Sequence, residues 1–125
     1  MPGTPDLRYL ESHEWHKPVG DTVLIGISQF AVDELTDITY LEIKKKSGAI
    51  KKGEAFAEIE SVKATSEIYS GVDGEVVGFN QEAVDNPALL NEDPYTKGWL
   101  VKIKVSDPAQ LQKLQSAADY EKSHS

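Results

Sequence analysis

The chain has 125 residues, 39% of them apolar, and its 21 acidic and 13 basic side chains give a formal net charge of −8 at pH 7. This length predicts one domain with a hydrophobic core. The negative charge argues against a nucleic-acid partner, because phosphate backbones would repel the protein. It favours docking on basic patches of partner proteins. There is no cysteine, which excludes disulfides, thiolate metal sites and a cysteine nucleophile.

Residues 1–6 are predicted to form a flexible tail. The start of the chain, MPGTPDLRYL, has neither the charged-then-apolar pattern of a secretory signal nor the composition of an Arg/Ser-rich transit peptide. The apolar runs are too short to span a bilayer, so no membrane association is expected. We therefore expect a cytoplasmic protein, or a mitochondrial-matrix protein if the chain is a mature eukaryotic form.

The first half of the chain predicts two strands with a short helix between them. The apolar segment 22–27 (TVLIGI) follows a Gly-Asp turn and predicts a buried strand, and 38–43 (ITYLEI) alternates as a half-buried strand. Ser28 is expected to cap the short helix between them. Segment 44–53 carries five lysines and two glycines, which predicts a solvated turn region.

The second half predicts a strand pair around Lys63, over 54–61 and 64–70, and further strands over 75–79 and 98–105. Segment 80–97 is expected to be a polar connection. From about residue 107 we predict a C-terminal helix, with Asp107 as N-cap, Pro108 in the first turn, Gln110 as capping-box partner, and Leu111 and Leu114 on its apolar face. Four aromatic residues are predicted to be core: Trp15, Phe30, Tyr40 and Trp99.

A weak internal repeat relates the two halves. Segment 20–35 (GDTVLIGISQFAVDEL) resembles 74–90 (GEVVGFNQEAVDNPALL): each has a Gly-acid turn, an apolar strand, a polar step with Gln and then Ala-Val-Asp. We expect each half to supply one sheet, with the Lys63 hairpin on the crossing between them. Many short strands at this spacing predict a mainly β protein, a flattened β-barrel or sandwich with short helices.

Lys63 stands at the predicted hairpin tip, in ESVKA (60–64), without the Asn-Gly or Asp-Gly that such turns prefer. An exposed lysine at a turn is most simply a solvating charge that discourages edge pairing. Nothing nearby predicts the lowered pKa that Schiff-base chemistry needs. The functional alternative is an attachment point, because a tight exposed turn offers the amine to a modifying enzyme without unfolding.

ESVKA resembles the lipoyl-lysine motif of the glycine cleavage system H proteins. Four further segments resemble that family in the same order: SHEW (12–15), GEVV (74–77), NEDPY (91–95) and GWL (98–100). The similarity runs from about residue 7 to residue 120. It implies a lipoyl/biotinyl-type hybrid fold, with residues 7–125 as one lipoyl-carrier domain.

The resemblance implies a carrier without catalytic or metal-binding residues of its own. Lipoate, amide-linked to Lys63, would take the aminomethyl group of glycine from a pyridoxal-phosphate-dependent glycine decarboxylase (P protein). It would pass that group to a tetrahydrofolate-dependent aminomethyltransferase (T protein) and be reoxidised by dihydrolipoamide dehydrogenase (L protein). Lipoyl-attachment enzymes are further implied partners, and a freely visiting carrier is expected to be a monomer.

The resemblance also places the bound aminomethyl arm near Ser12, Glu14 and Glu67. A hydroxyl and carboxylates suit an ammonium group through charge-assisted hydrogen bonds, although each could equally be an ordinary surface residue. NEDPY is expected to shape a turn, with Asn91 or Asp93 bonding local backbone.

The chain departs from the family pattern at several positions. Gly71 and Thr36 stand where proline and glycine are common, Glu67 stands where aspartate is common, and segment 44–50 lacks a proline. Gly71 is expected to loosen the turn that follows the hairpin, since proline restricts the unfolded chain more than glycine does.

Three alternative functions remain open from sequence. The protein could be a lipoyl relay or a specialised lipoyl carrier of another pathway, which needs the same lysine. It could be an acyl or carboxyl carrier domain, although biotin carriers usually show methionines beside the lysine and here the neighbours are Val62 and Ala64. Or it could be an unmodified β-domain used for protein contacts, in which case Lys63 is dispensable.

Overall fold

The structure is a computed structural model that describes residues 7–10, 12–107, 109–116 and 119–120. Ten strands are described within these ranges: β1 Arg8–Tyr9, β2 Glu14–Val19, β3 Thr22–Ile27, β4 Ile38–Ile43, β5 Gly48–Ile50, β6 Ala55–Ser61, β7 Thr65–Tyr69, β8 Gly74–Phe79, β9 Val101–Val105 and β10 Gln115–Ser116. The helices there are short: α1 Gln29–Leu35, α2 Gln81–Asp85, α3 Ala88–Glu92 and α4 Ala109–Gln112. None of them is long enough to cross a membrane.

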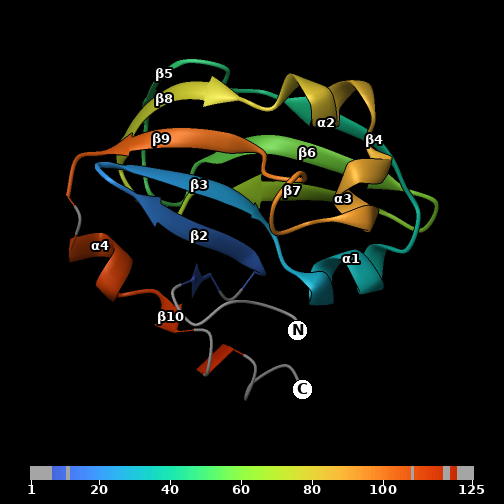
Figure 1. The fold of residues 1–125 in the computed structure, drawn as a ribbon, viewed down its shortest axis with the longest axis horizontal. Helices are drawn as coiled ribbons and strands as arrows, with labels where there is room; N and C mark the ends of the chain where they lie inside the picture. Colours follow the sequence, from blue (N-terminus) through green and yellow to red (C-terminus); the bar gives the residue numbers. More distant parts are fainter. Residues whose placement is uncertain (1–6, 11, 108, 117–118, 121–125) are drawn as a thin grey trace.

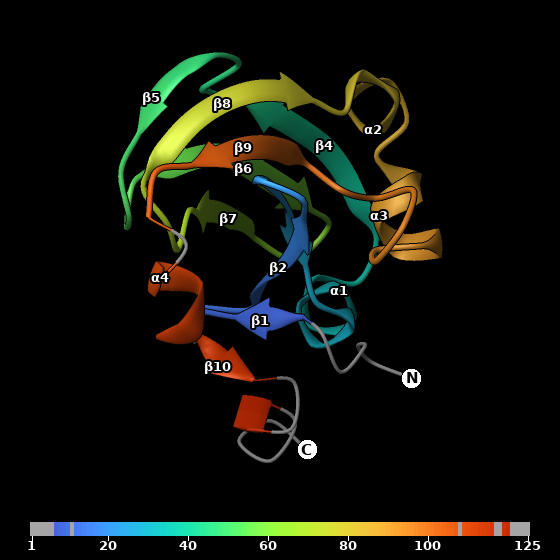
Figure 2. The same cartoon turned by 60° about the vertical axis from the view of Figure 1, so that its left-hand side comes forward.

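The strands form two antiparallel sheets that face each other. The larger sheet has the order β10-β1-β2-β3-β9-β8-β5, and the smaller one has the order β4-β6-β7. Figures 1 and 2 show α1, α2 and α3 at one end of the two sheets and α4 with β10 toward the other. The loop that joins β6 to β7 lies at the α1 end (Figure 1). The predicted flattened β-sandwich is confirmed, and the sheets do not close into a barrel.

The internal repeat corresponds to a strand followed by a capped short helix, once as β3 with α1 and once as β8 with α2. The prediction that each half supplies one sheet is wrong, because β3 and β8 both lie in the larger sheet, bridged by β9. The smaller sheet is built from the chain between the two repeats. The Lys63 hairpin therefore belongs to a separate layer rather than to a crossing between halves.

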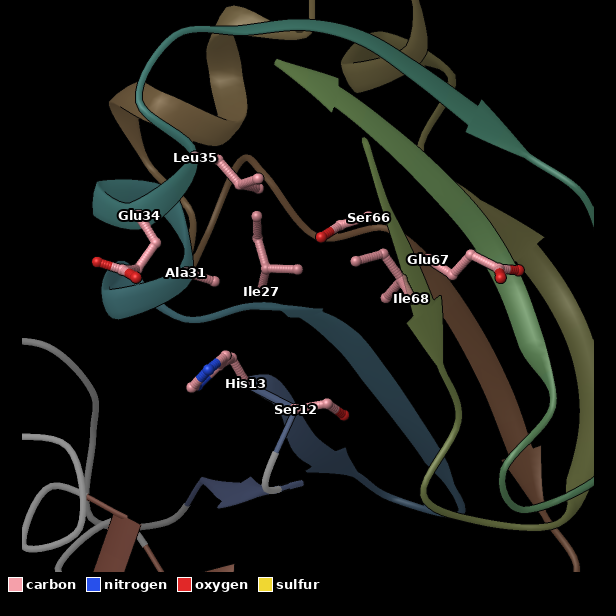
Figure 3. A pocket seen from close by; sticks show the side chains of 9 residues that line it. All are labelled: Ser12, His13, Ile27, Ala31, Glu34, Leu35, Ser66, Glu67 and Ile68. Carbon is pink, nitrogen blue, oxygen red and sulfur yellow. The ribbon is translucent and has the colours of Figure 1, made fainter. Parts of the chain in front are cut away.

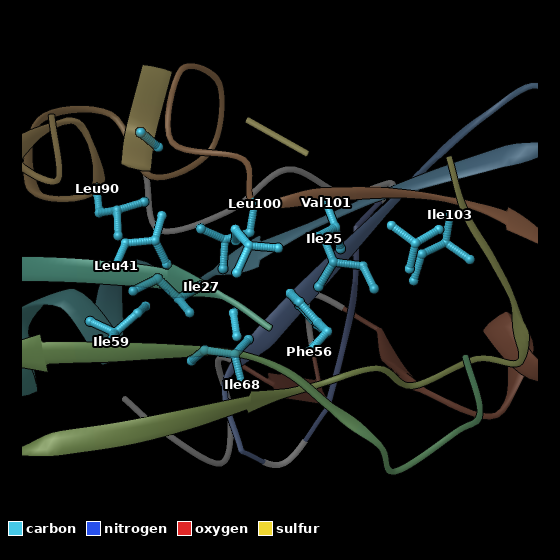
Figure 4. Packing of buried hydrophobic residues seen from close by; sticks show 14 of the residues in the cluster. Ile25, Ile27, Leu41, Phe56, Ile59, Ile68, Leu90, Leu100, Val101 and Ile103 are labelled. Atoms are coloured by element: carbon cyan, nitrogen blue, oxygen red, sulfur yellow. The ribbon is translucent and has the colours of Figure 1, made fainter. Parts of the chain in front are cut away.

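A single apolar cluster fills the space between the sheets (Figure 4). Alternation along each strand directs one set of side chains into this space, as in β3 and β9, where Val23, Ile25, Val101 and Ile103 are buried. Fully burying one such side chain contributes roughly 1.5–3 kcal/mol. A second cluster contains Leu7, Tyr9, Trp15 and Tyr120, with Phe30 and Trp99 packed against it.

The aromatic predictions hold for Trp15, which is fully buried, and for the partly buried Phe30 and Trp99. The prediction for Tyr40 is wrong: its side chain is 48% exposed. A register shift between Ile38 and Tyr40 explains the difference, because the irregularity breaks the alternation and leaves two successive side chains, Thr39 and Tyr40, on the solvent side.

Segment 80–97, for which the sequence predicts a polar connection and no helix, contains α2 and α3. Asn80 caps α2 by accepting from Ala83 N, and its side-chain NH₂ donates to the carbonyls of Lys97 and Trp99. Each helix has five residues, which is too short for a clear periodic signal. The lysine-rich turn region likewise contains the short edge strand β5, paired with β8.

NEDPY shapes a turn as predicted, in which the Asp93 carbonyl accepts from Gly98 N at 2.8 Å, but the Asn91 side chain does not bond local backbone. The Asn91 side chain instead accepts from Ile38 N at 3.0 Å and donates to the Thr36 carbonyl at 2.6 Å, so it fixes the connection between α1 and β4. In the same motif, the Pro94 carbonyl accepts from Trp15 Nε1 at 3.0 Å. The motif therefore joins distant parts of the chain.

The C-terminal helix prediction is partly confirmed. α4 is present, Asp107 Oδ1 accepts from Ala109 N, and Leu111 and Leu114 are buried. The capping-box role of Gln110 is wrong: its amide bonds both the backbone N–H and the carboxylate of Asp73. Pro108, the tail 1–6 and the last residues 121–125 lie outside the described part of the chain.

Candidate functional site

Lys63 lies at the tip of the β6–β7 hairpin, in a three-residue turn (62–64) that a serine hydroxyl organises. Ser61 N donates to the Ala64 carbonyl at 2.8 Å, and Ser61 Oγ accepts from the backbone N–H groups of Lys63 and Ala64 at 3.2 and 3.1 Å. These bonds take the place of a glycine-based turn. They explain how a tight tip forms without Asn-Gly or Asp-Gly.

The tip is also fixed to the body of the protein, because Val62 N donates to the Asp37 carbonyl at 3.1 Å. The Lys63 side chain is exposed, and its Nζ makes no ion pair or hydrogen bond with the residues that the structure describes. Val62 beside it is 66% exposed. The backbone of the tip is therefore ordered while its amine is accessible.

A cleft of about 240 Å³ lies between α1, β7 and the turn before β2. Figure 3 shows its lining: the apolar side chains come from the end of β3, from α1 and from β7, and polar side chains stand around them. The nine lining residues are Ser12, His13, Ile27, Ala31, Glu34, Leu35, Ser66, Glu67 and Ile68. Ser66 lies on β7 three residues after Lys63, so at no more than roughly 3.3 Å per residue the cleft begins within about 10 Å of the lysine.

Helix α1, which forms one wall of the cleft, is stabilised by capping interactions at both ends. Ser28 is the N-cap, and its Oγ accepts from Ala31 N at 3.2 Å. At the other end Thr36 N donates to the Val32 carbonyl, with Thr36 at φ +61°. This conformation suits glycine and strains a β-branched side chain.

The structure brings Ser12 and Glu14 together. Ser12 Oγ donates to Glu14 Oε1 at 2.5 Å, and Tyr69 N donates to Glu14 Oε2 at 2.7 Å. Glu14 is fully buried beneath the exposed Ser12 and does not itself line the cleft. Burial raises the pKa of Glu14 to about 6, against the opposing effect of its hydrogen bonds. Glu14 thus ties the turn before β2 to β7 as well as placing a carboxylate behind Ser12.

Glu67 is not brought together with that pair. Its backbone lies in the cleft wall, but its side chain points away from Ser12 and His13 (Figure 3), and its carboxylate lies 3.5 Å from Lys44 Nζ. Strand alternation gives the reason, because Ser66 and Ile68 on either side face the cleft.

His13, in the SHEW segment, is also a cleft-lining residue. It adopts φ +84°, a conformation that costs a non-glycine residue free energy and persists where surrounding contacts enforce it. His13 N donates to the Leu10 carbonyl, its carbonyl accepts from Ser28 N at 2.9 Å, and its ring packs at 4.8 Å from that of Phe30. Its Nδ1 lies 2.8 Å from the hydroxyl of Tyr120.

Sequence reasoning missed two contacts near the site. Fully buried His16 accepts from Gly71 N through Nε2 at 3.0 Å, so Gly71 anchors the turn after β7 instead of loosening it. Burial lowers the pKa of His16 to about 4, because its effect is larger than that of the hydrogen bonds with the backbone of Glu14 and Arg8, which raise the pKa. The second contact is between Tyr120 and His13, which lie too far apart in the sequence for a local motif to predict it. In the described part of the chain no three metal-ligating side chains form a cluster.

Comparisons with known proteins place these features in a family. The family model described as "Glycine cleavage H-protein" matches residues 7–125. The chain is 49% identical over 115 residues to a glycine cleavage system H protein of Vibrio vulnificus, with 91% of each chain covered. It is 46% identical to that of Staphylococcus carnosus, with 92% of this chain and 91% of the relative covered.

A solved structure is also similar. The crystal structure of a glycine cleavage system H protein from Mycobacterium marinum superimposes with a TM-score of 0.86 at 29% sequence identity. The match covers 97% of this chain and 98% of that one. The fold, the hairpin and the C-terminal segment therefore all lie within the matched region.

Proposed function

The chain belongs to the glycine cleavage H-protein family, and on that premise we propose that Lys63 carries lipoate and shuttles the aminomethyl group of glycine. As a family member the protein is a carrier component of the glycine cleavage system rather than an enzyme. The proposed route runs from the P protein, which decarboxylates glycine, to the T protein, which uses tetrahydrofolate, and then to the L protein for reoxidation. The proposed place of action is the cytoplasm, or the mitochondrial matrix for a mature eukaryotic form.

The observation that carries the proposal is the combination of an ordered tip with an exposed amine. An attachment enzyme must present an activated lipoyl carboxyl group to Lys63 Nζ, and the amide forms when that amine displaces the activating group. The Ser61 bonds and the Val62–Asp37 bond hold the backbone while the amine remains accessible. The residues present therefore fit an amide-linked arm.

The neighbouring cleft fits the same arm. When bound, lipoate supplies the sulfur and disulfide chemistry, and the protein supplies attachment, orientation and protection. The apolar residues Ile27, Leu35 and Ile68 would contact the hydrocarbon part of the arm and exclude water from it. Exclusion of water would slow hydrolytic loss of the carbon unit.

We propose that Ser12, Glu14 and Glu67 act on the amine at the end of the loaded arm, Ser12 by direct contact and the buried Glu14 through its charge behind Ser12. With its pKa near 6, Glu14 is mainly ionised at pH 7, so its charge favours a cation close to Ser12. Ser12 donates its proton to Glu14 and keeps its lone pairs available to accept from an ammonium group. Glu67 takes part only after it releases Lys44, which makes it the weakest contributor of the three.

The test is reconstituted glycine oxidation with P, T and L proteins, comparing Lys63→Arg with Lys52→Arg. Both substitutions keep the positive charge at an exposed position. Lys63→Arg is expected to abolish lipoylation and glycine turnover, because a guanidinium is not the acceptor amine, while Lys52→Arg keeps both. Normal glycine turnover by the lipoyl-free Lys63→Arg protein would contradict the carrier function. Lipoylation of the native chain without glycine turnover would instead point to a lipoyl relay.

A further inference from the structure

The C-terminal segment returns to the back of the cleft. β10 pairs antiparallel with β1, with Arg8 opposite Ser116 and Tyr9 opposite Gln115. Beyond it the Tyr120 ring stacks on the Tyr9 ring, with centroids 4.2 Å apart and planes inclined by 8°. Tyr120 is 2% exposed and is not one of the residues that line the cleft. A residue near the chain end is therefore packed directly behind it.

The Tyr120 hydroxyl contacts two different walls of the cleft. It lies 2.6 Å from Ser28 Oγ and 2.8 Å from His13 Nδ1. Ser28 is the N-cap of α1, the helix that supplies three lining residues, and His13 belongs to the adjoining wall, the turn before β2. Ser28 N also donates to the His13 carbonyl at 2.9 Å.

Both hydroxyl contacts can be satisfied together. When His13 Nδ1 carries no proton, Ser28 Oγ donates to Tyr120 and Tyr120 donates to His13; when Nδ1 is protonated, the chain of donors runs in reverse. In each case Ser28 Oγ still accepts from Ala31 N and caps α1. Burial raises the pKa of Tyr120 to about 12, so the phenol keeps the proton that this chain requires.

The geometry of the His13 backbone makes this contact matter. His13 at φ +84° is held by its backbone bonds to Leu10 and Ser28, by packing on Phe30 and by the Tyr120 hydroxyl. A strained conformation persists only while its surroundings enforce it. Removing one of these contacts is expected to increase local opening of the wall more than opening of the sheets.

We propose that Tyr120 is a positioning residue: its hydroxyl holds the His13 wall and the α1 wall together, and so sets how well the cleft encloses the arm and retains its cargo. The occupant of the cleft rests on the function proposed above, whereas the coupling of the two walls does not. The C-terminal segment thereby acts on the cleft without lining it.

The test compares Tyr120→Phe with Tyr40→Phe. Both changes remove one hydroxyl and keep the ring, but Tyr40 lies on the exposed side of β4 and does not line the cleft. Amide hydrogen exchange of the full unmodified chain is measured at Ser28, whose N–H bonds His13 across the two walls, and at Ile59 in the central strand of the smaller sheet. For Tyr120→Phe we expect exchange roughly 3- to 10-fold faster at Ser28, the range of one lost hydrogen bond, and little change at Ile59.

A second readout uses the lipoylated protein loaded with the aminomethyl group and follows spontaneous release of the carbon unit. Tyr120→Phe is expected to release it several-fold faster than the native protein and Tyr40→Phe at the native rate. Unchanged exchange at Ser28, or equal acceleration at Ser28 and Ile59, would overturn the coupling of the walls. Faster exchange at Ser28 with native release would overturn the link to cargo. Failure of the native chain to become lipoylated would refute the proposed function and leave the exchange result to decide the coupling.

Discussion

The opposing titrations of two neighbouring buried groups on β2 give a quantitative test of the structure. His16 is fully buried and accepts from Gly71 N, which requires an unprotonated Nε2. Glu14 is also fully buried and accepts from Ser12 and Tyr69. Burial penalises the charged form of both groups, so it lowers the pKa of the histidine and raises that of the carboxyl.

For His16 the pKa falls from 6.5 to about 4 on folding. The unfolded chain takes up the proton first, so the unfolding free energy is unaffected above pH 7.5 and falls as the pH drops through 6.5 and below. At 1.36 kcal/mol per pH unit the full loss is about 3 kcal/mol, most of which is reached at pH 4.5.

For Glu14 the pKa rises from 4.5 to about 6 on folding. The folded protein takes up this proton first, so the contribution is present below pH 4.5 and is lost as the pH rises through 6. Between pH 7.5 and pH 4.5 the unfolding free energy therefore gains about 1 to 2 kcal/mol from this group. The two groups together leave a net loss of about 1 kcal/mol.

Urea unfolding of the native chain, His16→Gln and Glu14→Gln at pH 7.5 and pH 4.5 isolates the two terms, because all other titrating groups are shared. The drop in unfolding free energy between the two pH values is expected to be about 2 to 3 kcal/mol smaller in His16→Gln and about 1 to 2 kcal/mol larger in Glu14→Gln than in the native chain. Equal drops in all three proteins would refute the burial of both groups as described.

Three further predictions concern positions near the site. Thr36→Gly is expected to raise the unfolding free energy by about 1 kcal/mol in urea titrations, because φ +61° strains threonine and not glycine. Gly71→Pro is expected to lower the unfolding free energy by about 2 kcal/mol or more, although the resemblance gives proline as common at this position. The substitution removes the N–H that bonds His16, and the added Cβ would lie 2.9 Å from His16 Nε2. In the loaded protein, Glu14→Gln is expected to leave lipoylation complete by intact mass but to speed release of the aminomethyl group, since it removes the charge behind Ser12; an unchanged release rate would remove Glu14 from the site.

Local pattern was sufficient for much of the fold. The strands at 22–27 and 38–43 have the predicted bounds, since each is a short apolar or alternating run closed by turn residues. Ser28 caps α1 as predicted. The same reasoning missed α2 and α3, because five residues give too little periodicity, and it misplaced Tyr40, because a register shift cannot be read from alternation.

The site was predictable where a motif is contiguous and not where contacts are distant in sequence. The position of Lys63 at an exposed hairpin tip follows from the local pattern, while its role as attachment point stays a prediction. Ser12 and Glu14, from one four-residue motif, do lie together. Asn91, Gly71 and Tyr120 each bond a partner more than 50 residues away, and no local rule predicts which partner a folded chain will bring to them. The orientation of Glu67 likewise depends on which face of β7 lies against the cleft.

The central claim, that Lys63 is the attachment point of a carrier, is tested most directly by intact mass after co-expression with a lipoyl-attachment enzyme in the presence of lipoate. The comparison is between the native chain and Lys63→Ala. The account predicts a single lipoyl increment on the native chain and none on the variant. An unmodified native chain, or an increment that persists in Lys63→Ala, would contradict it.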